Sequence, residues 1–153
     1  MTIRKAERKD IPDLVKLLAD DVLGQQREHY TIPLPELYYT AFERINQDTN
    51  QELVVVEEED QIVGTLQLTF IPYLTYQGGV RAQIEAVRVR SDRRKEGVGE
   101  QLFRWAIDRA HTRGAHLVQL TTDKKRPDAR RFYEKLGFVA SHEGMKLHLD
   151  NTQ

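Results

Sequence analysis

Residues 87–110, "VRVRSDRRKEGVGEQLFRWAIDRA", decide the fold. An alternating apolar run ends at Val89, a cluster of charges follows, and Gly97 and Gly99 stand directly before an amphipathic helical pattern. A strand that turns through glycines into a helix can hold an anion, because the first N–H groups of a helix have no partner within it. An ordinary connecting turn uses the same residue types, so the spacing and the surrounding sequence must separate the two interpretations.

Spacing excludes two well-known phosphate loops. A nucleoside triphosphate loop needs two glycines five residues apart followed by Lys and Ser or Thr, which Gly97 and Gly99 do not provide. A dinucleotide-binding loop needs a third glycine at position 102, which is Leu. A third pattern fits: Arg or Gln, two residues, Gly, one residue, then Gly or Ala, here from Arg94 to Gly99. Its glycines would let the main chain approach a pyrophosphate.

Composition predicts one soluble globular domain over residues 1–150. The chain has 153 residues, of which 31% are charged and 39% hydrophobic, with a net charge of -1. This balance gives no general attraction to nucleic acid, and no run of eighteen apolar residues predicts a membrane span. There is no cysteine, which excludes disulfides and thiolate chemistry and suits a reducing compartment. We expect a cytoplasmic protein with no nucleic-acid or membrane partner.

The periodicity predicts a mixed α/β order of seven strands and four helices. Apolar alternation marks a strand near the N-terminus, a hairpin of two strands after residue 51, and a further strand over residues 83–90. Helical spacing and end signals predict helices from Asp10 to about Leu23, from Glu36 to Gln47, from the glycine loop to about Arg113, and over residues 127–137. The runs "HLVQLTT" and "MKLHL" read as later strands, and one more follows the last helix.

Two ordered motifs resemble the GCN5-related N-acetyltransferase (GNAT) family, which uses acetyl-CoA. The strand "IEAVRV" is followed by "RRKEGVG", a helix, a strand and then "ARRFYEKLGF", which ends at Phe138, in the order and spacing of that family. The resemblance implies a mixed central sheet of six to seven strands flanked by about four helices. It also implies a cofactor cleft where the fourth and fifth strands splay apart at a bulge.

The resemblance places the cofactor along the fourth strand and the glycine loop. The main chain of Val87, Arg88 and Val89 would pair with the pantetheine arm, while Val87 and Val89 can also be plain core side chains. The pyrophosphate would lie on the N–H groups of the loop residues Arg94, Lys95, Glu96, Gly97, Val98, Gly99 and Glu100. The helix dipole and the local positive charge would favour the same anion.

Tyr133 matches the family tyrosine that protonates the departing thiolate. A phenol near pKa 10 can supply a proton to a thiol near 8.5 when it is held within hydrogen-bond reach. A buried structural tyrosine is the alternative. The sequence departs from the family where Asn is common and Arg126 stands instead. A basic contact to the cofactor phosphates from this region would replace the amide contact.

A base must take a proton from the attacking amine, and Glu85 is the candidate. It lies on the strand that would carry the acetyl group, and the two-residue period of a strand predicts that it shares a face with Val87 and Val89. A carboxylate that only orients the substrate, or a structural ion pair, would look the same. The five histidines are scattered and predict no metal site.

The family builds its acceptor pocket from the first helices and neighbouring loops. Here Asp21 and Glu28 would attract a cationic amine, and Tyr30 and Tyr76 would provide walls. Solvated acidic residues and surface tyrosines explain each of them equally well. The "KKRPDARRFY" region also resembles aminoalkylphosphonate acetyltransferases of the same family, which implies a small amine with an anionic group.

These features predict an N-acetyltransferase that moves the acetyl group of acetyl-CoA to a primary amine of a small molecule or peptide by direct attack in a ternary complex. Two other classes compete with it: a non-catalytic acyl-CoA-binding regulatory module of the same fold, and a nucleic-acid-binding regulator. Apolar residues of the later strands and of "YLTYQGG" are compatible with a homodimer.

Overall fold

The computed structural model describes residues 1–150, of which Val22 is described by its backbone alone. The chain divides into two compact units, one spanning Met1–Gln119 and one that begins at Leu120. The first unit contains the whole sheet and most of the helices, and the second contains one helix and the C-terminal segment. Each unit is described by itself.

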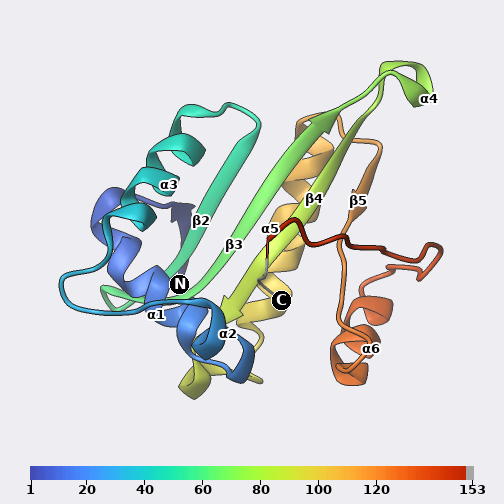
Figure 1. Ribbon diagram of the computed structural model, residues 1–153. Coiled ribbons are helices and arrows are strands. Elements are labelled where there is room, and N and C mark those ends of the chain that lie inside the picture. Colours follow the sequence, from blue (N-terminus) through green and yellow to red (C-terminus); the bar gives the residue numbers. More distant parts are fainter. Residues whose placement is uncertain (151–153) are drawn as a thin grey trace. The chain divides into compact units, whose positions relative to one another are not determined.

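The first unit alternates strands and helices in the order shown in Figure 1. Its strands and helices are β1 (Thr2–Lys5), the 3₁₀ helix η1 (Arg8–Asp10), α1 (Ile11–Ala19), α2 (Val22–Arg27), α3 (Glu36–Gln47), β2 (Gln51–Glu58), β3 (Gln61–Pro72), α4 (Thr75–Gly78), β4 (Val80–Val89), the 3₁₀ helix η2 (Ser91–Arg93), α5 (Val98–Thr112) and β5 (Leu117–Gln119).

The five strands form one mixed sheet in the order β1-β2-β3-β4-β5. The first three pairs are antiparallel, and β4 pairs with β5 in parallel over three residues, with Arg81 opposite Leu117 and Gln83 opposite Gln119. Beyond Gln83, β4 continues to Val89 past the last residue of β5. The pairing of β4 with β5 therefore stops well before β4 ends.

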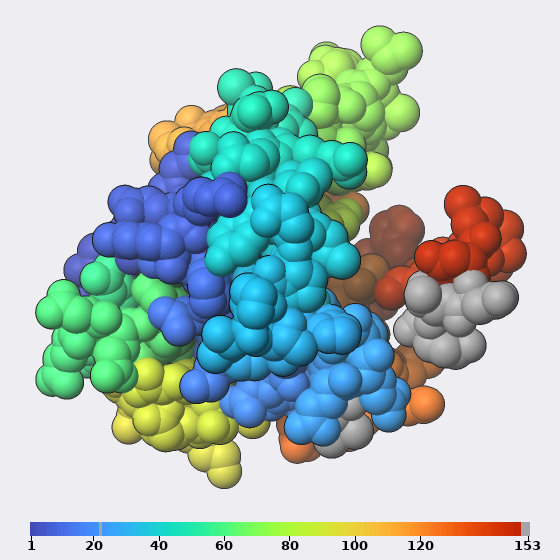
Figure 2. Space-filling model, turned by 60° about the vertical axis from the view of Figure 1, so that its left-hand side comes forward, coloured from blue at the N-terminus to red at the C-terminus, as the bar shows by residue number. Residues whose placement is uncertain are grey.

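The two faces of the sheet bury different apolar sets. On one face Val55 packs with Ile11 and Leu14 of α1 and Phe42 of α3. On the other, Val56 lies beside Val98 at the start of α5, because a Cβ built on Gly64 would meet both side chains at 3.2 and 3.3 Å. Figure 2 shows the first face, with α3 (cyan) over α1 (blue) and the loop of residues 91–97 (yellow) at the surface.

A β-bulge interrupts β4. Gln67 of β3 pairs with Glu85 and Thr65 pairs with Arg88, so two β4 residues stand opposite the single residue between Thr65 and Gln67. Ala86 adopts the left-handed conformation, with φ of 54°. This inserted residue shifts the alternation of the strand by one position, because successive side chains of a strand point to opposite faces.

Glu52 of β2 ties the C-terminal half of α5 to the sheet. Its Oε1 lies 2.7 Å from Arg109 Nε and its Oε2 lies 2.9 Å from Arg113 Nη1. Burial alone would raise the pKa of this carboxyl, but the hydrogen bonds and charges of the two guanidinium groups outweigh burial and hold the pKa below its usual value.

The second unit contains α6 (Pro127–Lys135) and an irregular segment after it. The helix begins with Pro127 at its first position and ends at Lys135, and Gly137, with φ of 99°, terminates it two residues later. Tyr133 packs edge-on against Phe132 and Phe138, with ring centroids 5.7 and 6.2 Å away. These aromatic contacts connect the helix to the chain that leaves it.

The mixed α/β class is confirmed, but the number of strands is smaller than predicted. Among residues 1–150 there are five strands rather than six or seven, because the segments after Phe138, including "MKLHL", pair with no other strand. Alternation shows that a segment suits a sheet, yet a strand forms only where a partner edge is available.

The first helix and the helix count also differ from the prediction. The helix expected from Asp10 to Leu23 is divided into α1 and α2, since Asp21 is extended and its carboxylate caps the second helix at Gly24. The described residues contain six α segments rather than four, and the short α4 in the β3–β4 connection includes two left-handed residues, Tyr76 and Gln77.

Candidate functional site

The turn into α5 presents unpaired backbone donors. Gly97 is the N-cap residue and adopts a left-handed conformation, with φ of 86°. Among residues 1–150, none accepts a hydrogen bond from the N–H groups of Val98, Gly99 and Glu100. A Cβ at Gly97 would meet no atom within 4 Å, and one at Gly99 would meet only Val89 Cγ2 at 3.8 Å. The turn therefore offers open space next to three donors, which suits an anion.

The charged residues around this turn fall into two groups. Arg90 pairs with Asp92, and Arg93 pairs with Glu58 and Glu96, so these carboxylates offset their charge. Arg94 and Lys95 have no ion pair within the described chain, although Arg94 Nε lies 3.4 Å from the Val89 carbonyl oxygen. Within residues 1–150 two cations beside the donors of α5 therefore have no ion-pair partner.

The bulged end of β4 leads directly into this turn. Val87, Arg88 and Val89 follow the left-handed Ala86, and they lie in the part of β4 that extends past β5. The parallel pairing that residues 81–83 make with β5 does not extend to them. Residues 87–89, expected to hold a pantetheine arm, are therefore followed after a short connection by residues 94–100, which are expected to hold a pyrophosphate.

Glu85 does not share a face with Val89, which corrects the expectation from the two-residue period. Glu85 is opposite Gln67 and Arg88 is opposite Thr65, which are two residues apart on β3 and so lie on one face. Val89 is opposite Gly64 and contacts the start of α5 on the other face. The bulge causes the change, because one extra residue reverses the alternation.

Side-chain amides orient Glu85. Gln83 Nε2 donates to Glu85 Oε1 at 2.7 Å, and Gln119 Nε2 of β5 donates to Gln83 Oε1 at 2.8 Å. Glu85 is exposed and carries the negative charge at the end of this chain of hydrogen bonds. A carboxylate held in this way can accept a proton or orient a cationic amine.

Asp21 and Glu28 are engaged within the protein. Asp21 caps α2 through the Gly24 N–H, and its other oxygen lies 3.3 Å from Arg88 Nε. Glu28 Oε1 accepts a hydrogen bond from Tyr38 Oη at 3.0 Å. Asp21 therefore attaches the α1–α2 connection to β4, and Glu28 attaches the segment after α2 to α3.

The two candidate wall tyrosines lie in different connections of the first unit. Tyr30 is exposed in the segment between α2 and α3. Tyr76 lies in α4, where its ring centroid is 4.7 Å from that of His116. Thr65 and Pro72 of β3 are seven residues apart, about 24 Å along a strand, so Tyr76 is at the opposite end of the hairpin from Arg88. The structure does not bring Tyr76 together with Asp21.

Two predicted site residues belong to the second unit. Tyr133 lies on α6 and is partly buried among Phe132 and Phe138. Arg126 is the N-cap residue of α6, and its N–H donates to the Asp123 carbonyl oxygen at 3.0 Å. Their roles towards the cofactor remain predictions.

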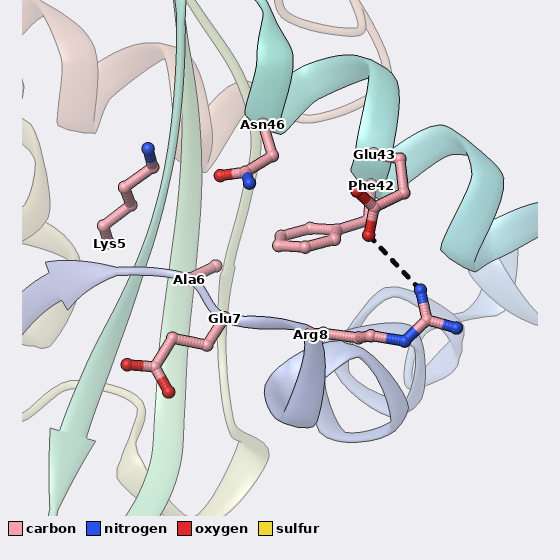
Figure 3. Close-up of a pocket in the computed structure, with 7 residues that line it drawn as sticks. All are labelled: Lys5, Ala6, Glu7, Arg8, Phe42, Glu43 and Asn46. Atoms are coloured by element: carbon pink, nitrogen blue, oxygen red, sulfur yellow. Dashed lines mark hydrogen bonds and ion pairs between the residues drawn. The ribbon is translucent and has the colours of Figure 1, made fainter.

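Two surface hollows lie away from the bulge and the glycine turn. One is lined by Arg8, Lys9, Pro12 and Tyr39. The other, drawn in Figure 3, is lined by residues 5–8 at and after the end of β1 and by residues of α3, including Phe42, whose ring points towards Ala6. Arg8 and Glu43 form an ion pair at 3.3 Å across its rim. Neither hollow includes a residue of 85–100.

The sequence of β4 contains a further signal of the site. Gln83 and Glu85 alternate with the buried Ala82 and Ile84, which marks a polar face of β4. Arg88 was expected to contribute only its backbone, but the bulge brings its side chain to the face of Glu85. An alternating "AQIE" pattern could have identified Gln83, whereas the position of Arg88 depends on the bulge.

Metals and membranes can be considered only for residues 1–150. In that part of the chain no three His, Asp or Glu side chains gather in a way that could hold a metal ion. No helix there has both the length and the apolar character needed to cross a bilayer.

The chain resembles known acetyltransferases. A family model described as the acetyltransferase (GNAT) family matches residues 19–138. An aminoalkylphosphonate N-acetyltransferase of Salmonella typhimurium is 32% identical over 95 residues, which cover 62% of this chain and 61% of that protein. A glucosamine 6-phosphate N-acetyltransferase of Trypanosoma brucei brucei is 34% identical over 89 residues, or 58% of each chain. This chain therefore matches about three fifths of the length of these curated relatives.

A solved structure matches almost the whole chain. The crystal structure of a protein described as a transcriptional regulator from Bacillus halodurans C-125 is 59% identical. The match covers 97% of this chain and 99% of that one, with a TM-score of 0.94.

Proposed function

Since this chain belongs to the acetyltransferase (GNAT) family, we propose that it transfers the acetyl group of acetyl-CoA to a primary amine of a small molecule or peptide. The observation that carries the proposal is the turn into α5: within residues 1–150 three of its N–H groups have no acceptor and Arg94 and Lys95 have no ion pair, and there is open space at Gly97. This combination suits a pyrophosphate.

Acetyl-CoA would lie along the bulged edge and the turn. Main-chain groups of Val87 to Val89 would hold the pantetheine arm, and the turn from Arg94 to Glu100 would hold the pyrophosphate. The basic residues of the second unit, including Arg126, would contribute further positive charge. Bound there, the cofactor supplies an activated acetyl group as a thioester.

The reaction we propose is direct attack in a ternary complex. The amine nitrogen forms a bond to the acetyl carbon, and the carbon–sulfur bond breaks. Glu85, oriented by Gln83, would take the proton that the amine loses, either directly or through water. Tyr133 would donate a proton to the departing thiolate, and an N–H of β4 would stabilise the developing charge on the carbonyl oxygen.

Two measurements test the proposal. Acetyl-CoA should raise the melting temperature, because a ligand that binds only the folded state stabilises it by mass action. Addition of primary amines should then release free thiol from acetyl-CoA. No rise in melting temperature at millimolar acetyl-CoA would refute cofactor binding, and a rise without thiol release across a broad amine panel would refute the transfer.

A regulatory function is the second candidate, and the similarity to a protein described as a transcriptional regulator favours it. A non-catalytic module of this fold would bind acetyl-CoA without releasing thiol. A nucleic-acid-binding regulator would bind a DNA duplex with strong salt dependence. The balance of 23 basic and 24 acidic side chains provides little general attraction for DNA. Fluorescence anisotropy with duplex DNA distinguishes a nucleic-acid-binding regulator from the enzyme.

We also propose a homodimer in the cytoplasm as the working form. Exposed apolar residues support an association, because large exposed apolar side chains commonly mark interfaces. They lie at the hairpin tip (Leu74, 94% exposed) and near the C-terminus (Met145, Leu147 and Leu149, 94, 86 and 94% exposed). Sedimentation equilibrium at micromolar protein measures the mass directly, and a monomer there would refute the dimer.

A further inference from the structure

We propose that the acceptor carries an anionic group as well as its amine, that the Arg88 side chain binds this group, and that Glu85 receives the amine. This inference rests on the proposed acetyl transfer and names the substrate class of the same site: short primary amines with a carboxylate, phosphonate or phosphate group. It assigns a specificity-determining role to the Arg88 side chain, in addition to the main-chain role predicted for this residue.

The bulge places opposite charges on one face of β4. Glu85 pairs with Gln67 of β3, and Arg88 pairs with Thr65. Because these two β3 residues are two apart, the backbones of Glu85 and Arg88 are separated by about 7 Å along the strand. Glu85 and Arg88 are three residues apart in the sequence, so in a regular strand they would point to opposite faces, and the bulge brings them to one face. A small zwitterion presents an ammonium and an anion over a comparable span, so one molecule can contact both side chains.

The sheet face around Glu85 is polar. The same face is apolar beneath α1 and α3, where Val55 and Phe42 pack in the core. Towards β4 and β5 it carries side chains that hydrogen-bond to one another rather than to a covering helix. These side chains are Gln51, Gln67, Thr69, Gln83, Glu85 and Gln119. Amides at a sheet surface suit a polar ligand, because they donate and accept hydrogen bonds.

Arg88 is held in place before any ligand arrives. Its Nε lies 3.3 Å from Asp21 Oδ2, and its Nη1 donates to the Val87 carbonyl oxygen at 2.8 Å. Asp21 is itself fixed, because it caps α2 through the Gly24 N–H. Figure 1 shows α2 next to the end of β4 where Arg88 lies. A guanidinium that is already positioned loses little freedom when it binds an anion, and its planar fork matches carboxylate and phosphonate oxygens.

Relatives support this substrate chemistry. The Salmonella relative is named for aminoalkylphosphonates and the Trypanosoma relative for glucosamine 6-phosphate. Both names describe an amine on a molecule that also carries a phosphorus-centred anion. Arg88 and Glu85 would recognise that shared chemistry, and the identity of the anion can be resolved by experiment.

The test compares three acceptors that differ in the anion: 2-aminoethylphosphonate, β-alanine and propylamine. We expect the wild-type kcat/KM, measured by thiol release, to be at least about tenfold higher for an anionic acceptor than for propylamine. A charge-assisted hydrogen bond to the anion is strong enough to provide this factor. The preferred anion is the one with the higher value. In Arg88→Met the advantage should fall to within about twofold, because no cation remains at this position.

A matched control and a conservative variant complete the test. Arg90→Met removes a neighbouring arginine that pairs with Asp92, and it should keep the wild-type preference. Arg88→Lys should restore part of the preference, because lysine keeps the charge without the fork. If Arg88→Met does not fold, Asp21→Ser keeps an oxygen for the α2 cap and releases Arg88, and it should raise KM for the anionic acceptors alone.

The outcomes separate this inference from the proposed function. Calorimetric titration of 2-aminoethylphosphonate and propylamine into the protein with coenzyme A measures the anion preference without turnover. Anion-selective binding that Arg88→Met abolishes supports the subsite even when no thiol is released, and then only the transfer is refuted. Equal kcat/KM for all three acceptors, or an Arg88→Met variant that keeps the preference, overturns the subsite while acetyl transfer stands.

Discussion

Replacing Gly97 by alanine tests the pyrophosphate seat most directly. Gly97 has φ of 86°, a conformation that costs a residue with a Cβ about 1–2 kcal/mol. Its new Cβ would meet no protein atom within 4 Å, so conformational strain is the only expected loss of stability. For a domain of this size each kcal/mol lowers the melting temperature by about 2–4 °C. The variant should therefore melt about 2–8 °C below the wild type.

The larger effect should be on the cofactor. Acetyl-CoA at one hundred times its dissociation constant stabilises the folded state by about 2.7 kcal/mol, which raises the melting temperature by about 5–11 °C. A methyl group in the space next to the α5 donors keeps the pyrophosphate away from them. A tenfold weaker dissociation constant would reduce the stabilisation at the same concentration to about 1.4 kcal/mol, a rise of about 3–6 °C.

Gly99→Ala is the matched control. A Cβ at this position would make only an ordinary contact of 3.8 Å with Val89, and Gly99 has no positive φ. The sequence pattern of the loop also accepts alanine here. The variant should be as stable as the wild type, or more stable by up to about 1 kcal/mol because alanine favours a helix. Its rise in melting temperature with acetyl-CoA should match that of the wild type.

Differential scanning fluorimetry with increasing acetyl-CoA measures both effects in one experiment. The melting temperature without ligand reports the strain, and the rise with ligand reports the affinity. A Gly97→Ala protein with the wild-type rise would refute the position of the pyrophosphate at this turn. Equal losses for Gly97→Ala and Gly99→Ala would show that binding does not depend on the open face of Gly97.

Three further changes test other parts of the molecule. Tyr133→Phe should lower kcat at least about tenfold while the rise in melting temperature with acetyl-CoA stays unchanged, because only the proton donor is lost; an unchanged kcat would remove this residue from the acid role. Glu52→Gln should lower the free energy of unfolding in urea by about 1–3 kcal/mol at pH 7. The pKa of Glu52 is held below its usual value, so its contribution to stability is present above the unfolded-state pKa and is lost as the pH falls through the folded-state pKa. The unfolding free energies of wild type and Glu52→Gln should therefore converge in acid, and a difference that stays constant with pH would contradict this. Gly24→Ala should lower the free energy of unfolding by about 1–3 kcal/mol, because its Cβ would clash with the Leu18 carbonyl oxygen, and a wild-type urea midpoint would show that the α1–α2 turn adapts freely.

Local sequence patterns predicted the elements that depend on neighbouring residues. The glycine turn into α5, the hairpin of β2 and β3, and α6 between Pro127 and Gly137 all formed close to the predicted positions. Each carries its own signals in backbone preference or apolar period, so few distant contacts are needed to specify it. The division between α1 and α2 was missed because an aspartate caps a helix only when its backbone is extended, as that of Asp21 is.

The candidate site depended partly on the tertiary structure. The residues predicted to hold the cofactor at the glycine turn follow from a short motif, and the structure adds that within residues 1–150 the first N–H groups of α5 have no acceptor and Arg94 and Lys95 have no ion pair. The face of Glu85 could not be predicted, because a strand with perfect alternation would have put it with Val89. The bulge at Ala86 arises from pairing with β3, and this pairing sets the side-chain directions.

By itself the sequence determined a mixed α/β fold, the ordered motifs of the acetyltransferase (GNAT) family and a glycine turn into a helix, because helix ends, glycine conformation and apolar period are properties of short segments. Only the tertiary structure decided that Arg88 and Glu85 share a face, that Asp21 holds Arg88, and that the "MKLHL" segment does not form a strand within residues 1–150. Strand pairing and register are set by partners far away in the sequence, and they determine which charges can meet one substrate.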